Sequence, residues 1–367
     1  MTDARMTNNQ ATRLPMQLDR LVAALKDGGS NISGLVLLLL ALFALFGVLL
    51  PESFLRLTTL QAMMYQLPEL GLLSLAMVIP LISGGLNLAI IATANQAALL
   101  MAWILTLCMP AGTEGLGLGL WIAGALAAGF LLCLIIGATT GFIVSVMNVH
   151  PILVTLGVQT LVGGVSVWLT RGKTISGFPE PLLWISNETV MGIPISFLAF
   201  AIMAFVVHVV LTRTPLGIRI HMVGSNSEAT RYSGVDTRRV IIWVYVLSSL
   251  LCWFAAIIMM ARFNSAGADI AQSYLLITVL AAMLGGVDPY GGFGRIVGLV
   301  VSLVILQTIS SGFNLLGISA HLTLALWGVT LLLVMAVKRI AAHWRVLVPA
   351  RKRSLTDSTN SRMDQTT

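Results

Sequence analysis

The side chains best suited to chemistry within the apolar runs of this sequence are neutral hydrogen-bonding groups. Amides both donate and accept hydrogen bonds, so they suit an uncharged, hydroxyl-rich solute better than an ion or a carboxylate. The same groups also tie helices together in membranes, at about 0.6 kcal/mol per bond. The candidate pathway residues are Asn87, Asn95, Gln96, Gln159, Gln307 and Asn314.

Ionisable side chains are scarce in the same runs. Glu69 stands beside Pro68, where we expect a membrane span to begin, and Asp288 follows a glycine pair. Arg262 and Asp269 fall in an expected external turn. Carriers driven by protons or sodium usually need buried carboxylates. The sequence therefore argues against a stand-alone secondary transporter.

Enzyme motifs are absent from the sequence. It contains no H-E-x-x-H, no G-x-S-x-G and no cluster of histidines and carboxylates. Residues 172–174 match the end of a phosphate-binding loop, but Val167 occupies the place of its first glycine. Cys108, Cys133 and Cys252 lack metal-ligand spacing and are interpreted as small apolar residues. We expect no catalytic residue, no metal site and no cofactor bound by this chain.

The composition indicates which elements position these side chains. The 367-residue chain is 57% hydrophobic and 10% charged, with a mean hydropathy of +0.94, whereas soluble domains are about a quarter charged. Its apolar runs are long enough for membrane helices and lack the alternation of a membrane barrel. This predicts an all-α, polytopic membrane protein of about ten transmembrane helices. The expected spans are 34–50, 67–83, 88–108, 118–143, 152–170, 195–212, 240–261, 273–286, 294–312 and 320–337.

Basic residues predict the orientation of these spans. With the N-terminus inside, seventeen Lys and Arg residues fall on the cytoplasmic side and four outside. Both termini and residues 213–239 are therefore expected to face the cytoplasm, and the high pI of about 9.8 reflects topology rather than nucleic-acid binding. The expected organisation is a cytoplasmic tail at 1–33, a transmembrane domain at 34–338 and a basic, then disordered, cytoplasmic tail at 339–367.

Several connections and breaks have their own signals. Residues 51–66 predict an interfacial helix, and residues 171–194 are expected to fold over the outer mouth. Gly137 and Gly141 predict close helix packing. The pairs at 84–85 and 285–286 predict broken spans that could line a pathway.

The polar stretch 213–239 predicts a short helix with marked ends. Ser225 or Asn226 can cap its first turn, Glu228 can complete a capping box with Ser225, and Gly234 can take a left-handed stop. Because the spans carry no energy source of their own, we expect a partner docked on this stretch to supply it. The alternative is an ordinary basic loop that meets lipid head groups, which is the expected role of Arg238 and Arg239.

Four blocks of this sequence resemble the membrane permease subunits of bacterial ABC importers for simple sugars, the family of the ribose permease. The family loop G-R-x-I-x-A-x-G-x-N-x-x-A-A-R-x-x-G-I is approximated from Gly217 to Val235. The other blocks are Pro151-Ile-Leu-Val-Thr155-Leu-Gly157, the glycine-rich run 285–298 and Asn314-Leu-Leu-Gly317-Ile318-Ser319. The resemblance covers residues 35 to 338. The chain departs where the family often has G-G-I-D-L-S, because residues 84–89 read Gly-Gly-Leu-Asn-Leu-Ala, and it lacks an arginine that is usual near Gly163.

The resemblance implies a multi-pass subunit of the bacterial inner membrane that carries a neutral sugar or polyol. It implies a second permease subunit, identical or paralogous, cytoplasmic ATP-hydrolysing subunits that use the ATP, and a periplasmic solute-binding protein. It also implies that the 213–239 stretch presents a coupling helix to the ATPase. The residues expected to make or shape this contact are Gly224, Asn226, Glu228, Ala229, Arg231 and Gly234.

The sequence is also compatible with other function classes. The same type of permease could carry a nucleoside or a branched-chain amino acid. A stand-alone channel or carrier would need no partner ATPase, and a membrane enzyme would need a catalytic cluster that the sequence does not provide.

Overall fold

The computed structural model describes residues 30–110, 112–319 and 321–332, and these residues are mostly helical. The first helices are α2 (Ser30–Leu49), α3 (Pro51–Phe54), α4 (Leu57–Ile82) and α5 (Ile90–Trp103), which continues into a π-helical extension, η1 (Ile104–Cys108). They are followed by α6 (Gly115–Val146), α7 (Pro151–Thr170), α8 (Glu180–Asn187), α9 (Ile195–Arg213) and α10 (Pro215–Ser225). The last are α11 (Ser227–Tyr232), α12 (Thr237–Phe263), α13 (Tyr274–Leu284) and α14 (Ile296–Leu315). Four two-residue strands, β1 (Ile175–Ser176), β2 (Thr189–Val190), β3 (Ile193–Pro194) and β4 (Ser265–Ala266), form two antiparallel pairs, β1 with β4 and β2 with β3.

The polytopic helical fold is confirmed. Among the described residues, eight helices are long and apolar enough to cross a membrane, and each overlaps one of the predicted spans. The predicted spans at 273–286 and 320–337 instead contain shorter apolar helices, α13 and His321–Leu332. The predicted tails lie outside the described residues, except that α2 begins at Ser30. The described chain divides into one compact unit up to Ile318 and a second that begins at Ser319.

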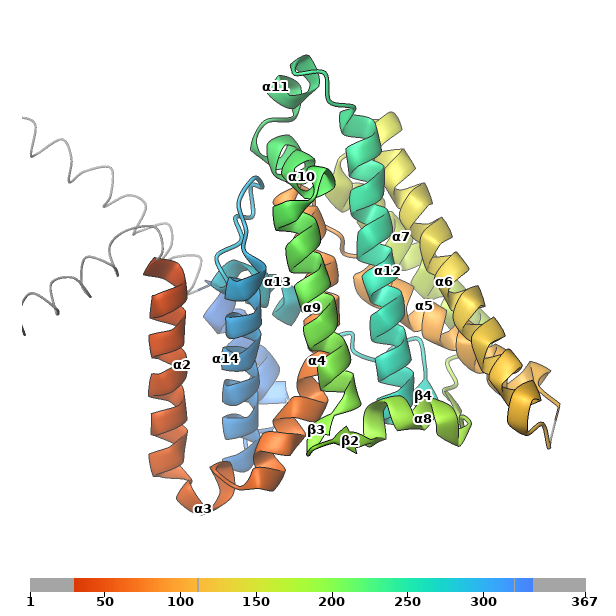
Figure 1. Cartoon of the computed structure of the whole chain (residues 1–367), viewed down its shortest axis with the longest axis vertical. Coiled ribbons are helices and arrows are strands. Elements are labelled where there is room, and N and C mark those ends of the chain that lie inside the picture. Colours follow the sequence, from red (N-terminus) through yellow and green to blue (C-terminus); the bar gives the residue numbers. More distant parts are fainter. Residues whose placement is uncertain (1–29, 111, 320, 333–367) are drawn as a thin grey trace, which may run out of the picture. The chain divides into compact units, whose positions relative to one another are not determined.

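Helix α4 is the buried centre of the first unit. Every residue from Leu67 to Ile82 is buried, and α9, α12, α13 and α14 all pack against this helix. Figure 1 shows α4 among these helices, with α5, α6 and α7 on the far side of α12. A helix that is apolar on all its faces and enclosed by other helices suits this position.

The prediction of a separate interfacial helix at 51–66 is wrong. Residues 51–54 form the short α3, and α4 begins at Leu57, so that Pro68 lies inside one continuous helix. A proline inside a helix removes one hydrogen bond and kinks the axis, but does not have to end the helix when neighbours hold it. The span therefore begins ten residues earlier than predicted, and Glu69 belongs to its interior.

Both glycine pairs interrupt helices, as predicted. Gly84 follows the end of α4 with φ +81°, and Gly286 follows the end of α13 with φ +87°. Only glycine adopts this left-handed conformation at no steric cost. The predicted close packing at Gly137 and Gly141 is also confirmed, because a Cβ at either position would lie 2.8 Å from the backbone of α12.

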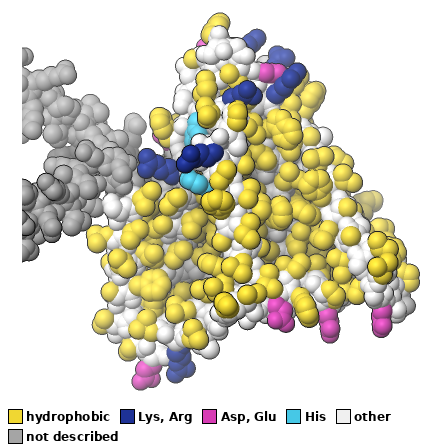
Figure 2. Space-filling model, viewed as in Figure 1, with side chains coloured by type: hydrophobic (Ala, Val, Ile, Leu, Met, Phe, Trp, Pro, Cys, Tyr) yellow, Lys and Arg dark blue, Asp and Glu magenta, His cyan; other side chains and the backbone are white. Residues whose placement is uncertain are grey.

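Charged side chains gather at the two ends of the unit. In Figure 2 most of the Lys and Arg side chains lie at the end that carries α10 and α11, together with a few acidic ones, and a broad hydrophobic belt separates this end from an opposite margin that is mostly acidic. At that opposite end α8 packs against α9 and α12, close to β2, β3 and β4 (Figure 1). The belt is the surface that a membrane would cover.

Candidate functional site

The polar stretch between α9 and α12 forms two short helices. Thr214 caps the first, α10, because its hydroxyl accepts a hydrogen bond from the Gly217 nitrogen at 3.3 Å, and Pro215 occupies the first helical position. Helix α10 is additional to the single short helix predicted for this stretch. We call α10 and α11 together the platform.

Asn226, not Ser225, caps α11. Its side-chain oxygen accepts a hydrogen bond from the Ala229 nitrogen at 2.9 Å, whereas Ser225 is the last residue of α10. The predicted capping box between Ser225 and Glu228 is therefore wrong, since the cap stands one residue later. Gly234 ends the helix with φ +82°, as predicted.

The platform presents most of the predicted docking residues to solvent. Asn226, Glu228, Ala229, Arg231 and Gly234 are exposed. Gly224 is half-buried and has another role, described next. Their role in docking stays a prediction.

Gly224 brings the platform into contact with the end of α4 and with the loop before α14. A Cβ on Gly224 would overlap the carbonyl oxygen of Ile82, the last residue of α4, and would lie 2.5 Å from the Gly292 nitrogen. The Gly292 nitrogen donates a hydrogen bond to the same Ile82 oxygen at 2.8 Å. A Cβ on Gly291 would lie 2.7 Å from the Cα of Gly84. We call these four glycines, 84, 224, 291 and 292, the glycine junction.

The junction brings three backbones into direct contact. They belong to the end of α4, the end of α10, and the loop 287–295 that precedes α14. Main chains that touch without intervening side chains move together, because there is no flexible group between them to absorb a displacement. The contacts at the junction therefore leave no flexible side chain between the platform, the end of α4 and the loop before α14.

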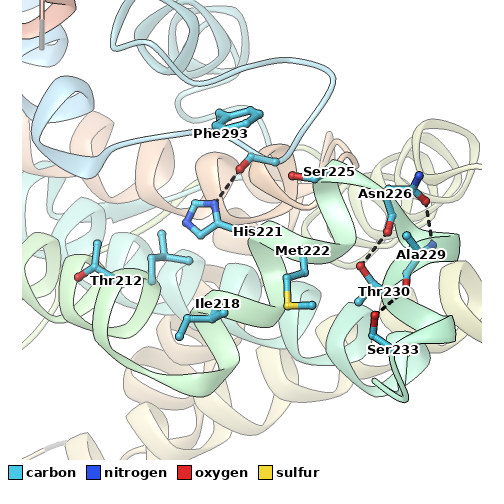
Figure 3. Close-up of a pocket in the computed structure, with 12 residues that line it drawn as sticks. Thr212, Ile218, His221, Met222, Ser225, Asn226, Ala229, Thr230, Ser233 and Phe293 are labelled. Carbon is cyan, nitrogen blue, oxygen red and sulfur yellow. Dashed lines mark hydrogen bonds between the residues drawn. The ribbon is translucent and has the colours of Figure 1, made fainter. Parts of the chain in front are cut away.

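A depression of about 640 Å³ lies between the platform and loop 287–295. His221 stands within it, and its Nδ1 lies 3.1 Å from the carbonyl oxygen of Gly292, as Figure 3 shows. Met222, Ala229 and the 70%-exposed ring of Phe293 also line it. Such a surface, partly apolar and ringed by backbone and hydroxyl groups, suits a protein partner.

Two of the predicted pathway amides hold helices and loops together. Asn87 is buried, donates to the Ser248 hydroxyl at 2.9 Å and accepts from the Ala89 nitrogen at 3.1 Å. Asn95 donates to the carbonyl oxygens of Ala268 and Ile270, both at 2.8 Å. Both side chains thus have structural partners in this conformation.

The other four amides are dispersed. Gln96 accepts a hydrogen bond from the Ser166 hydroxyl of α7, Gln159 is half-buried on α7, and Asn314 is exposed near the end of α14. Gln307 donates to Gln66 of α4 at 2.9 Å. The structure therefore does not bring the six predicted residues into one site, and which of them meet a solute stays a prediction.

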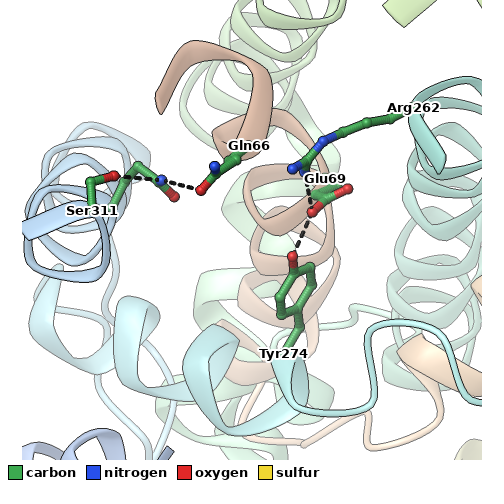
Figure 4. Close-up of polar contacts among 6 residues, drawn as sticks. Gln66, Glu69, Arg262, Tyr274 and Ser311 are labelled. Atoms are coloured by element: carbon green, nitrogen blue, oxygen red, sulfur yellow. Dashed lines mark hydrogen bonds and ion pairs between the residues drawn. The ribbon is translucent and has the colours of Figure 1, made fainter. Parts of the chain in front are cut away.

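Sequence reasoning missed a buried ion pair. Glu69, fully buried inside α4, accepts hydrogen bonds at Oε1 from Arg262 Nη1 and from the Tyr274 hydroxyl, each at 2.5 Å (Figure 4). Arg262 lies in the last turn of α12, not in the external turn expected for it. Glu69 was expected where a span begins, and it lies instead in the interior of α4. The lack of buried carboxylates, which argued against a stand-alone secondary transporter, therefore does not extend to Glu69.

Comparison with known proteins places the chain in a family. Residues 59–335 match the family described as "Branched-chain amino acid transport system / permease component". The chain is 26% identical over 322 residues to the autoinducer 2 import system permease protein LsrD of Photorhabdus temperata, which covers 84% of this chain and 91% of that protein. It is 28% identical over 320 residues to the LsrD of Klebsiella pneumoniae, covering 85% and 92%.

No solved structure matches the chain. The family match covers most of the transmembrane helices and includes the platform and the glycine junction. The chain therefore belongs to the family of branched-chain amino acid transport system permease components.

Proposed function

We propose that this chain is the transmembrane permease subunit of an ATP-binding-cassette importer. It passes a neutral, hydroxyl-rich solute such as a sugar or polyol across the inner membrane, and a separate ATP-hydrolysing subunit docks on the platform. A periplasmic binding protein delivers the solute, and a second permease subunit completes the pathway. The similarity to permeases named for autoinducer 2 import supports an import system of several components.

The observation that carries this proposal is the glycine junction. The platform is exposed at α11 and both of its helices are capped, and its backbone touches the end of α4 and the middle of loop 287–295. A partner drives a conformational change only when it binds the two states with different affinity. A platform in backbone contact with α4 and loop 287–295 would let an ATP-hydrolysing subunit bound there act on those segments.

The distribution of charge supports a cytoplasmic platform. Most of the basic side chains visible in Figure 2 lie at the end that carries α10 and α11, whereas the opposite margin is mostly acidic. Cytoplasmic loops of membrane proteins carry the excess of Lys and Arg. In this orientation the platform meets the compartment that contains ATP.

The choice of a sugar or polyol rests on the resemblance to the permeases of simple-sugar importers. The family description favours a branched-chain amino acid as the second candidate. Binding measurements on the cognate periplasmic protein, with sugars, polyols and branched-chain amino acids as competing ligands, discriminate between the two.

The proposal is tested by reconstitution. The purified chain is placed in proteoliposomes with its binding protein, with and without the ATP-hydrolysing subunit, and solute accumulation is measured. We expect accumulation only when the ATPase and ATP are both present. Accumulation of equal rate in its absence would remove the proposed mechanism.

Arg231→Glu is expected to weaken the docked complex about tenfold, the range for reversing one charge at a partly desolvated contact. Arg231 is exposed in the last turn of α11. The measurement is the amount of ATP-hydrolysing subunit retained on the immobilised permease. Arg171→Glu is the matched control, since Arg171 is also exposed but follows α7 at the opposite end. Equal retention by the two variants would exclude Arg231 from the contact.

A further inference from the structure

A single carboxylate oxygen closes the segment between α12 and α13. We call residues 264–273 the α12–α13 connection. Arg262 lies just before it and Tyr274 directly after it, and both donate to Glu69 Oε1 at 2.5 Å. Figure 4 shows the two side chains converging on Glu69 from the two ends of this segment. Glu69 thereby ties both ends of the connection to α4.

Two further elements hold the same connection. The Asn95 amide of α5 donates to the carbonyl oxygens of Ala268 and Ile270. Strand β4, inside the connection, pairs with β1, which brings Ala266 opposite Ile175. Ala266 is fully buried as a result. The connection is therefore clamped from α4, α5 and β1 in this conformation.

The ion pair is not the simplest way to hold these helices. A buried pair pays a desolvation penalty, and apolar residues of similar volume often stabilise a fold equally well or better. Glu69 Oε2 is also buried without a hydrogen-bond partner among the described residues. Ionisable groups at membrane depth usually mark function. When helices separate, a buried carboxylate can replace its protein hydrogen-bond donors with other donors, which apolar side chains cannot do.

Glu69 and Tyr274 are each connected to the glycine junction by a helix. Along α4, Glu69 lies thirteen residues before Ile82, which corresponds to about 20 Å of helix. Along α13, Tyr274 is the first residue, and the helix ends at the glycine pair that opens loop 287–295. A displacement of the junction therefore acts on the two sides of the Glu69–Tyr274 contact through two different helices.

We propose that Glu69 is a positioning residue for transport. It holds the α12–α13 connection against α4 while this end of the pathway is closed, and the solute passes after Tyr274 and Arg262 release the carboxylate. This inference rests on the proposed function, because it assumes that the platform is driven by a partner. Closure of the connection itself can be measured without any partner.

The first measurement uses Ala266→Cys as a reporter, in a chain whose native Cys108, Cys133 and Cys252 are replaced. The rate at which a water-soluble maleimide labels position 266 reports opening of the connection. Tyr274→Phe removes one hydroxyl and preserves the ring and the ion pair. We expect labelling to become about tenfold faster, as when one hydrogen bond to a charged group is lost.

The matched control is Tyr65→Phe. Tyr65 lies one turn before Glu69 on the same helix, and its hydroxyl donates to the Asn187 carbonyl oxygen of α8 at 3.3 Å. This variant also loses one hydroxyl but leaves Glu69 untouched, so labelling should keep the wild-type rate. Equal labelling rates in the Tyr274→Phe and Tyr65→Phe variants would overturn the proposal.

The second measurement separates positioning from a purely structural role. In the reconstituted complex, Tyr274→Phe should lower the number of solute molecules imported per ATP, and Tyr65→Phe should not. Faster labelling with an unchanged ratio would also overturn the proposal, because the contact would then only stabilise the fold. A wild-type complex without ATP-dependent uptake would refute the proposed function instead, and labelling would still decide whether Tyr274 holds the connection.

Discussion

Gly224→Ala is expected to abolish most solute uptake while the chain still inserts in the membrane. The added Cβ would overlap the Ile82 carbonyl oxygen and crowd the Gly292 nitrogen, so α10 must move away from both backbones. Overpacking of this kind costs about 1–3 kcal/mol, which corresponds to a fall in uptake of about 5-fold to 150-fold if it acts on the coupled state. The measurement is the rate of uptake at saturating ATP, together with the rate of ATP hydrolysis.

The matched control is Gly157→Ala. Gly157 lies on α7, where an added Cβ meets nothing within 4 Å, so the methyl group should be tolerated. ATP hydrolysis should persist in both variants, because neither methyl group replaces one of the exposed side chains of α11. Wild-type uptake by Gly224→Ala would show that the backbone contact at the junction does not transmit motion.

Arg262→Ala is expected to destabilise the folded chain strongly. It leaves the Glu69 carboxylate buried with no opposite charge, which typically costs about 3–5 kcal/mol. The Arg262 side chain is 22% exposed in the folded chain, so we expect the lower end of this range. The free energy of unfolding in mixed micelles measures the effect.

Two other variants make this result specific. Arg56→Ala removes an exposed arginine near the same end of α4 and should change the free energy of unfolding little. Glu69→Gln combined with Arg262→Gln removes both charges and should recover most of the stability, since neutral replacement of a buried pair is often tolerated. No recovery in the double variant would mean that Arg262 acts through packing rather than charge.

Local sequence patterns were sufficient to predict the membrane fold. Runs of apolar residues marked all eight long helices, and the two glycine pairs marked the helix ends at Gly84 and Gly286, because backbone conformation there depends on the residue itself. The start of α4 was mispredicted for the opposite reason. The polar residues and Pro68 argue locally against a span, and packing in the folded chain overrides them.

The site was predicted only where its signals are local. The α11 stop at Gly234 follows from neighbouring residues, whereas the choice of Asn226 over Ser225 as the cap depended on where α10 ends. The Glu69–Arg262 pair joins residues 193 positions apart, and the glycine junction joins three segments. A single sequence contains no sign of such pairings. The local signal that marked Glu69 as unusual was its position as a single carboxylate between Pro68 and a long apolar run.

In the proposed function the platform receives the ATP-hydrolysing subunit and faces the cytoplasm. The most direct test places a photo-crosslinking amino acid at position 231 of α11, and at position 171 for comparison, in the membrane-embedded complex. We predict a crosslink to the ATP-hydrolysing subunit from position 231 and none from position 171. A crosslink from position 171 to that subunit, or from position 231 to the periplasmic binding protein, would contradict the account.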